Sequence, residues 1–141
     1  MTRRGVALLE LLLAIALLLL LGGIVAPRLA AIADAAAVRA ARRELLAALD
    51  AARGAPIRLG TSVALRDDGT RRTVAPLAPP DTQAVWRGPV AARHGVHQTG
   101  PGHPLTFGPA GIATGASNRS ITLSRGSASM TVVISRLGRI R

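Results

Sequence analysis

One carboxylate lies inside the longest apolar stretch of the sequence. From Val6 to Ala26, 21 residues carry a single charge, that of Glu10. A charge costs several kcal/mol at the centre of a bilayer and less near an interface, so an ionisable residue in such a stretch usually has a function. Glu10 stands near the start of the stretch, and a side chain that reaches back to the lipid headgroups is the alternative interpretation.

The other residues able to do chemistry are few and scattered. The sequence has no cysteine and seven acidic residues in all. The only candidate metal ligands are three histidines in a stretch rich in glycine and proline, His94, His97 and His103. No Gly-rich phosphate loop and no Ser/His/Asp order is present. The sequence therefore predicts no enzyme, no cofactor and no metal site, and it predicts histidines that are solvated in a loop.

The chain is strongly basic. All 18 basic residues are arginine, and the formal net charge is +11. This balance favours contact with anionic surfaces or nucleic acid, and it also serves solubility. With one Trp, one Phe and no Tyr there is little on which bases could stack, so a basic patch would contact phosphates without reading sequence. The candidate phosphate contacts are Arg119, Arg125, Arg136, Arg139 and Arg141.

The apolar stretch itself has the length of a membrane span. As a helix, 21 residues extend about 32 Å, close to the ~30 Å hydrocarbon core of a bilayer. Arg3 and Arg4 precede it, and the positive-inside rule keeps them in the cytoplasm. Pro27 is expected to bend or break the helix. We therefore expect a leader at 1–5 and a transmembrane helix at 6–26, with all that follows lying across the membrane.

The next segment, 27–53, is rich in alanine and has a helical period. Its apolar positions fall on one face, and its charged positions fall largely on another. Gly54 and Pro56 are expected to end this amphipathic helix. The apolar face, which should pack on the rest of the chain, consists of Val38, Ala41, Leu45, Ala48, Leu49 and Ala52.

Residues 54–141 change character. Proline, glycine, serine and threonine become frequent, and short alternating runs replace the helical period. The sequence thus predicts an α+β fold, in which one long N-terminal helix is followed by a small antiparallel β-sheet or sandwich domain. The predicted strands are 57–59, 62–65, 72–75, 84–87, 105–107, 120–124, 129–135 and 139–141, with a turn at 125–128 and a loop at 88–104.

The N-terminal residues resemble the class III signal of type IV pilins and type II secretion pseudopilins. The features are Gly5, an apolar residue after it, Glu10 five positions beyond the glycine and the long apolar run. The resemblance implies that a prepilin peptidase cuts between Gly5 and Val6 and methylates the new N-terminal amine. It implies that Glu10 neutralises the N-terminal ammonium of a neighbouring subunit in a filament, since a buried charge is tolerable when paired. Pro27 stands where the family commonly bends its helix, whereas Val6 and Ala7 depart from the family's usual Phe and Thr.

The C-terminal part extends the resemblance. Leu105–Gly111, Ile121–Leu123, Val132–Ile134 and Gly138–Ile140 are similar to H-type minor pseudopilins, which have an F-x-x-x-G element and a closing G-R-[VI] strand. The paired cysteines of a typical major type IV pilin are absent. Region 66–104 matches no motif of the family. The fold implied by both ends of the chain is therefore pilin-like.

The resemblance implies a minor pseudopilin that supports protein secretion across the outer membrane. It would cross the bacterial inner membrane once, with a cytoplasmic N-terminus and a periplasmic C-terminal domain. The expected partners are other pseudopilins or pilins, the prepilin peptidase and the membrane. One alternative is a minor type IV pilin-like protein that supports pilus biogenesis or whose arginines bind DNA for uptake. Another is an ordinary secretory signal cleaved after Ala33, against which the length of the apolar run and Glu10 both argue.

Overall fold

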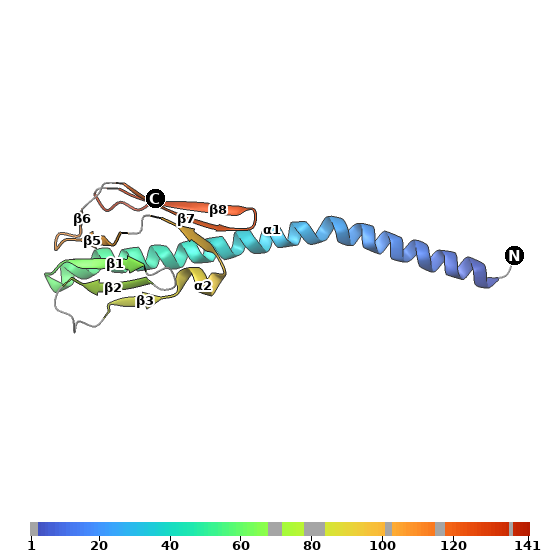
Figure 1. Cartoon of the computed structure of the whole chain (residues 1–141), viewed down its shortest axis with the longest axis horizontal. Coiled ribbons are helices and arrows are strands. Elements are labelled where there is room, and N and C mark those ends of the chain that lie inside the picture. Colours follow the sequence, from blue (N-terminus) through green and yellow to red (C-terminus); the bar gives the residue numbers. More distant parts are fainter. Residues whose placement is uncertain (1–2, 68–71, 78–83, 101–102, 115–117, 136) are drawn as a thin grey trace. The chain divides into compact units, whose positions relative to one another are not determined.

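The computed structural model describes residues 3–67, 72–77, 84–100, 103–114, 118–135 and 137–141, with side chains from Ala7 onward. The chain divides into two compact units, Met1–Ala33 and Asp34–Arg141. The helix α1 (Arg3–Leu59) contains the described part of the first unit and is the first element of the second (Figure 1). The strands and a short second helix follow it, all in the second unit. This element order confirms the predicted fold class.

The N-terminal part of α1 is helical because alanine and leucine, both strong helix formers, dominate its sequence. The sequence predicts a bend or a break at Pro27. The helix is continuous through this residue, so no break occurs there. Proline lacks the N–H that would bond the carbonyl four residues earlier, and that carbonyl belongs to Gly23. The helix backbone therefore lacks one hydrogen bond at this position.

The C-terminal end of α1 lies beyond the predicted end at residue 53. Helix continues through Gly54 and Pro56 and stops at Leu59. Ala55 and Pro56 are buried, and this packing offsets the one hydrogen bond that the proline removes. Gly60, at φ 64°, then ends the helix in the left-handed conformation, and its N–H donates to the carbonyl of Pro56 at 2.9 Å.

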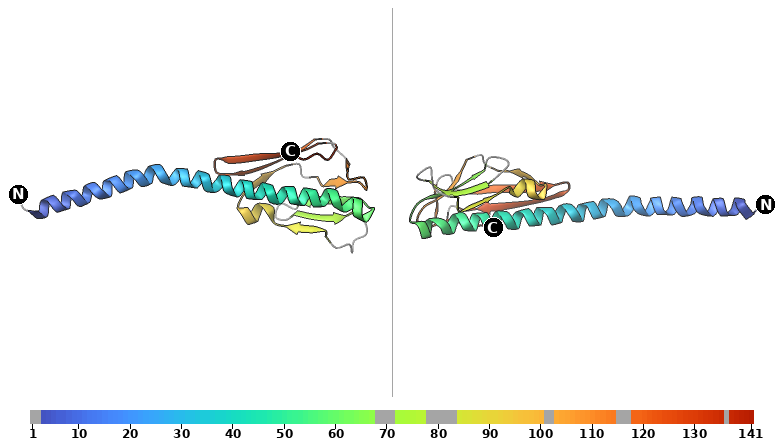
Figure 2. Two further views of the ribbon diagram at one scale, coloured as in Figure 1. Left: turned by 180° about the vertical axis from the view of Figure 1, so that it is seen from behind. Right: turned by 90° about the horizontal axis from the view of Figure 1, so that it is seen from below.

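Within the second unit, the predicted apolar face of α1 forms the base of the core. Each of its six positions is at most 1% exposed, which confirms the helical period as a guide to packing. Both sheets lie along this side of the helix (Figure 2). The buried positions are Val38, Ala41, Leu45, Ala48, Leu49 and Ala52.

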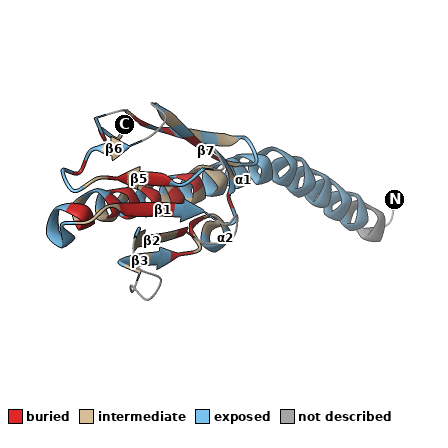
Figure 3. Cartoon of the chain, turned by 60° about the vertical axis from the view of Figure 1, so that its left-hand side comes forward, coloured by how far each residue is buried: buried red, intermediate tan, exposed pale blue. Residues whose placement is uncertain are grey.

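The larger sheet has five antiparallel strands in the order β3-β2-β1-β5-β6. In β1 and β2 the residues Val63 and Pro76 face each other at one end of the register, and Asp67 and Arg72 at the other. Buried residues of β1 and β5 lie beside buried residues of α1 in the ribbon (Figure 3). Phe107 on β5 is fully buried. The strands are β1 (Val63–Asp67), β2 (Arg72–Pro76), β3 (Trp86–Gly88), β5 (Leu105–Phe107) and β6 (Ala113–Thr114).

The smaller sheet has three antiparallel strands in the order β4-β7-β8. These are β4 (His97–Thr99), β7 (Arg119–Arg125) and β8 (Ala128–Ile134). A tight turn joins β7 to β8, and Gly126 adopts φ 52° there. At the chain end, Val133 and Arg141 exchange two backbone hydrogen bonds of 2.9 Å, so the tail pairs with β8.

Most of the predicted strands are present, with ends that differ by one or two residues. Three of these predictions are wrong. Residues 139–141 form an isolated bridge, between Ile140 and Ile134, rather than a strand. Residues 57–59 are the last turn of α1 rather than a strand, and the predicted loop 88–104 contains both α2 (Val90–His94) and β4. Residues 57–59 are exposed and continue the preceding helix, whereas α2 and β4 are short and depend on contacts with residues distant in sequence.

Candidate assembly segment and basic surface

The first unit presents an apolar surface. Its leucines are exposed, for example Leu19 at 72%. By length and composition α1 is able to cross a membrane, and a signal sequence near an N-terminus would have the same properties. Apolar side chains exposed over this length need lipid or other protein surfaces around them.

Glu10 lies on this apolar surface. Its side chain is exposed, and it has no ion-pair partner among the side chains that the structure describes. Gly5 and Val6 belong to the first turns of α1, because the helix begins at Arg3. A carboxylate among apolar residues requires a cation or a polar headgroup beside it when it leaves water. Glu10 is thus an exposed carboxylate on an apolar helix surface, without an ion-pair partner among the described side chains.

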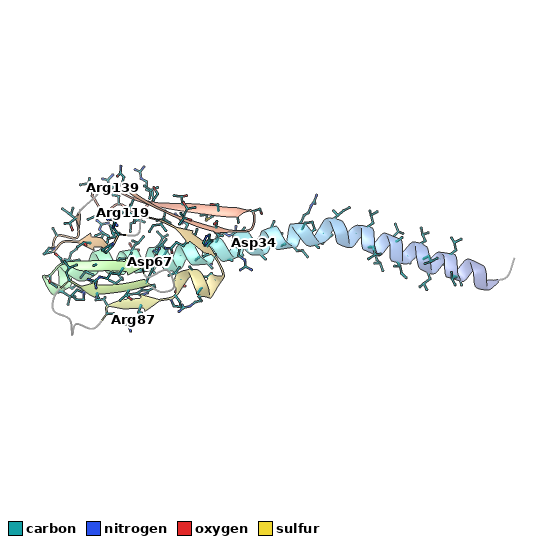
Figure 4. The ribbon with its side chains drawn as sticks, viewed as in Figure 1. Asp34, Asp67, Arg87, Arg119 and Arg139 are labelled. Carbon is teal, nitrogen blue, oxygen red and sulfur yellow. The ribbon has the colours of Figure 1, made fainter. Side chains whose placement is uncertain are left out.

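Two of the five candidate phosphate contacts, Arg119 and Arg125, are held within the fold. Figure 4 labels Arg119 and also Asp34, the partner of Arg125. Arg125 on β7 pairs with Asp34 on α1, with 3.0 Å between Nε and Oδ1. Its Nη1 also donates to the carbonyl of His94 at 2.9 Å. Arg119 donates from Nη1 to the carbonyl of His103 at 2.7 Å. These guanidinium groups fasten the small sheet to α1 and to neighbouring loops, and they are only partly available to phosphate.

The other candidates lie near the C-terminus. The backbone N–H of Arg139 donates to the Ser135 hydroxyl at 3.0 Å, which fixes the final turn. Arg139 and Arg141 are exposed and line the same surface depression beside β8. Arg136 lies outside the described residues. The structure therefore brings together two of the five arginines as a free basic pair.

A contact that the sequence did not indicate connects α1 to α2. Glu44 accepts a hydrogen bond from His94 Nε2 at 2.8 Å. It also forms an ion pair with Arg93, with 3.0 Å between Nη1 and Oε1. His94 is thus a partly buried structural residue, which corrects the prediction of a solvated loop histidine. His97 and His103 are exposed, and no group of three potential ligands converges on a metal position within the described ranges.

Asp34→Asn is expected to lower the free energy of unfolding by about 1 kcal/mol, because the ion pair with Arg125 is only partly shielded from water. Gly126 lies so close to the Asp34 carboxylate that a Cβ there would collide with it, which places the β7–β8 turn against α1. The measurement is thermal unfolding of the full chain in a fixed membrane mimetic. The control is Asp50→Asn, the same charge change at an exposed position of α1, and equal effects of the two variants would contradict the role of the pair.

Comparison with known proteins identifies a family and two similar structures. A family model described as "Type II transport protein GspH" matches residues 41–138, well over half of the chain. The type IV minor pilin FimU of Pseudomonas aeruginosa, in one crystal form, has a TM-score of 0.63 at 17% identity, covering 74% of this chain and 86% of FimU. A second crystal form of FimU gives 0.61 at 18% identity, covering 73% and 90%. No curated protein sequence matches the chain. The likeness to FimU shows a pilin-like fold.

Proposed function

The chain belongs to the family of the type II transport protein GspH, and we propose that it serves as a minor pseudopilin of a type II secretion pseudopilus. The observation that carries this proposal is the family match over residues 41–138, to which the exposed apolar helix is joined. In this role the protein catalyses nothing. Its N-terminal helix holds it first in the inner membrane and later among other pseudopilins, and its second unit is displayed in the periplasm.

Maturation follows from the N-terminal sequence under this proposal. A prepilin peptidase cuts between Gly5 and Val6 and methylates the amine of Val6. Arg3 and Arg4 stay in the cytoplasm, because basic residues flanking a span remain on that side. The five-residue leader is thereby removed, and the apolar helix begins at a charged amine four positions before Glu10.

Assembly under this proposal uses the carboxylate of Glu10. When a subunit leaves the bilayer for the filament, the new amine needs a counter-charge in an apolar surrounding. Glu10 of an adjacent subunit supplies it, and a mismatch of register would leave both charges unpaired at a cost of several kcal/mol. Glu10 thus sets the axial position of each subunit.

Gene deletion tests this function against its closest rival. Removing the gene should stop secretion across the outer membrane, so that folded secretion substrates accumulate in the periplasm, while pili and DNA uptake remain. Complementation with the full chain should restore secretion. Normal secretion together with lost piliation would overturn the assignment to a secretion system and favour a pilus.

A pilus role is the second candidate, favoured by the fold shared with a type IV minor pilin and by the free pair Arg139 and Arg141. In this role the pair would contact DNA phosphates outside the cell membrane. Arg125 and Arg119 would contribute less, because each is engaged within the fold.

If DNA binds, the double variant Arg139→Gln and Arg141→Gln should reduce the salt dependence of binding. Each phosphate contact contributes about 0.9 to the slope of log K against log salt concentration, so the slope should fall by about 2. The measurement is duplex binding by the full chain in nanodiscs between low and physiological salt. The control is Arg87→Gln, at an exposed position of β3. No binding at low salt removes the DNA role.

A further inference from the structure

A cavity of about 540 Å³ lies in the second unit, between the two sheets. Its volume is in the range of pockets that hold small ligands or peptide side chains. Part of its lining is apolar and comes from both sheets: Leu65, Leu105, Ile121 and Ile134. This part would receive an apolar group.

One charge in the lining is buried, and it belongs to Arg72 on β2. The side chain is 4% exposed, and its Nη2 donates to Oδ2 of Asp67 at 3.0 Å. Nε and Nη1 have no hydrogen-bond acceptor among the residues that the structure describes. Buried N–H groups without an acceptor are costly and rare. Burial lowers the pKa of Arg72, and the neighbouring Asp67 offsets this only in part.

The rest of the polar lining contains both donors and acceptors, and one of the acceptors is the carboxylate of Asp67. His97 and Gln98 come from β4, and Arg119 comes from β7. The Gln98 amide donates to Asp67, which is therefore shared between that amide and Arg72. Part of the cavity wall is thus apolar, and the charged part combines two arginines, Arg72 and Arg119, with one carboxylate, Asp67, so that it is positive on balance.

We propose that this cavity binds a carboxylate carried on an apolar peptide segment, with Arg72 as its counter-charge. Nε and Nη1 of Arg72 lie beneath the cavity surface, so a small shift of the side chain toward a bound carboxylate would give them the acceptor that they lack. Charge-assisted hydrogen bonds to arginine are among the stronger ones. The apolar wall excludes fully hydrated anions and favours a carboxylate with aliphatic neighbours. The carboxylate belongs either to the end of a partner chain or to an acidic side chain within it. The proposal goes beyond the role in secretion and is independent of it, because the cavity lies wholly in the second unit.

The test uses the full chain in nanodiscs, with empty nanodiscs as the blank, and ligand-observed NMR titrations. The probes are N-acetyl-leucyl-leucine, its C-terminal amide, and N-acetyl-leucyl-glutamate amide, whose carboxylate is on the side chain. At least one of the two acids should bind about tenfold more tightly than the neutral amide. The tighter acid identifies the source as a chain end or a side chain. Equal affinity for acids and amide, or no binding at millimolar probe, overturns the proposal.

Variants connect the binding to Arg72. Arg72→Gln should weaken acid binding about tenfold and leave the amide unchanged, whereas Arg87→Gln, the same charge change on the neighbouring strand, should leave both unchanged. Arg72 is buried, so Ala92→Trp provides a second variant if Arg72→Gln does not fold. Ala92 is exposed on α2 and lines the cavity, so the indole should occlude it and abolish acid binding. Acid binding unchanged in the folded variants would place the site elsewhere and overturn the proposal.

Discussion

Gly5→Ala is expected to abolish processing, so that the chain accumulates in the membrane with residues 1–5 still attached. Two physical effects act together. A methyl group at the residue before the scissile bond would occupy space that the peptidase must approach closely, and alanine stabilises helix over glycine by about 1 kcal/mol. Because α1 begins at Arg3, the peptidase must open the first turn of a helix to reach this bond. Intact-mass measurement of the purified chain reports the result.

Gly22→Ala is the matched control for this variant. Gly22 lies in the same helix, and a Cβ added there meets nothing within 4 Å. The same chemical change should therefore leave cleavage at Gly5 unaffected. Normal cleavage of the Gly5→Ala chain would contradict the proposed processing site.

Glu10→Val should leave membrane insertion intact and remove assembly. Valine makes the apolar stretch more hydrophobic, so the amount of chain in the membrane fraction should not fall. The amine of a neighbouring subunit, however, would be buried without its counter-charge. Breaking a buried pair costs about 3–5 kcal/mol, which corresponds to a loss of association of roughly a hundredfold or more. Co-purification of partner pseudopilins after cross-linking in cells measures this loss.

Two further variants test whether the effect depends on the charge of Glu10 rather than on its shape. Glu10→Gln keeps the size and hydrogen-bonding capacity of the side chain and removes its charge, so it should fail nearly as badly as valine. Asp50→Asn removes a charge from an exposed position of the same helix and should assemble normally. Unchanged co-purification in the Glu10→Val chain would refute the role of Glu10.

Periodicity predicted the parts of the fold that depend on local pattern. The six apolar positions of the amphipathic helix are all buried, and the strands on either side of Gly126 lie within one residue of their predicted ends. In each case one face of a regular element must be covered, so the sequence itself carries the signal.

Contacts between distant residues account for what the sequence could not indicate. Helix α2 depends on His94 meeting Glu44, fifty residues earlier in the chain. The sequence alone assigns Arg125 to the basic surface, because its partner Asp34 lies far away in the sequence. Arg72 and Asp67 are different, because opposite charges across a hairpin are a local signal that could have been noticed. The burial of Arg72 beside a cavity, by contrast, depends on how the two sheets pack together.

The central claim is that this chain is a processed subunit of a pseudopilus. Its most direct test is mass spectrometry of the N-terminal peptide of this chain in pseudopili isolated from the host. We predict that the chain is present in the filament and begins at an N-methylated Val6. Absence of the chain from the filament, or a mature N-terminus at Asp34, would contradict the claim.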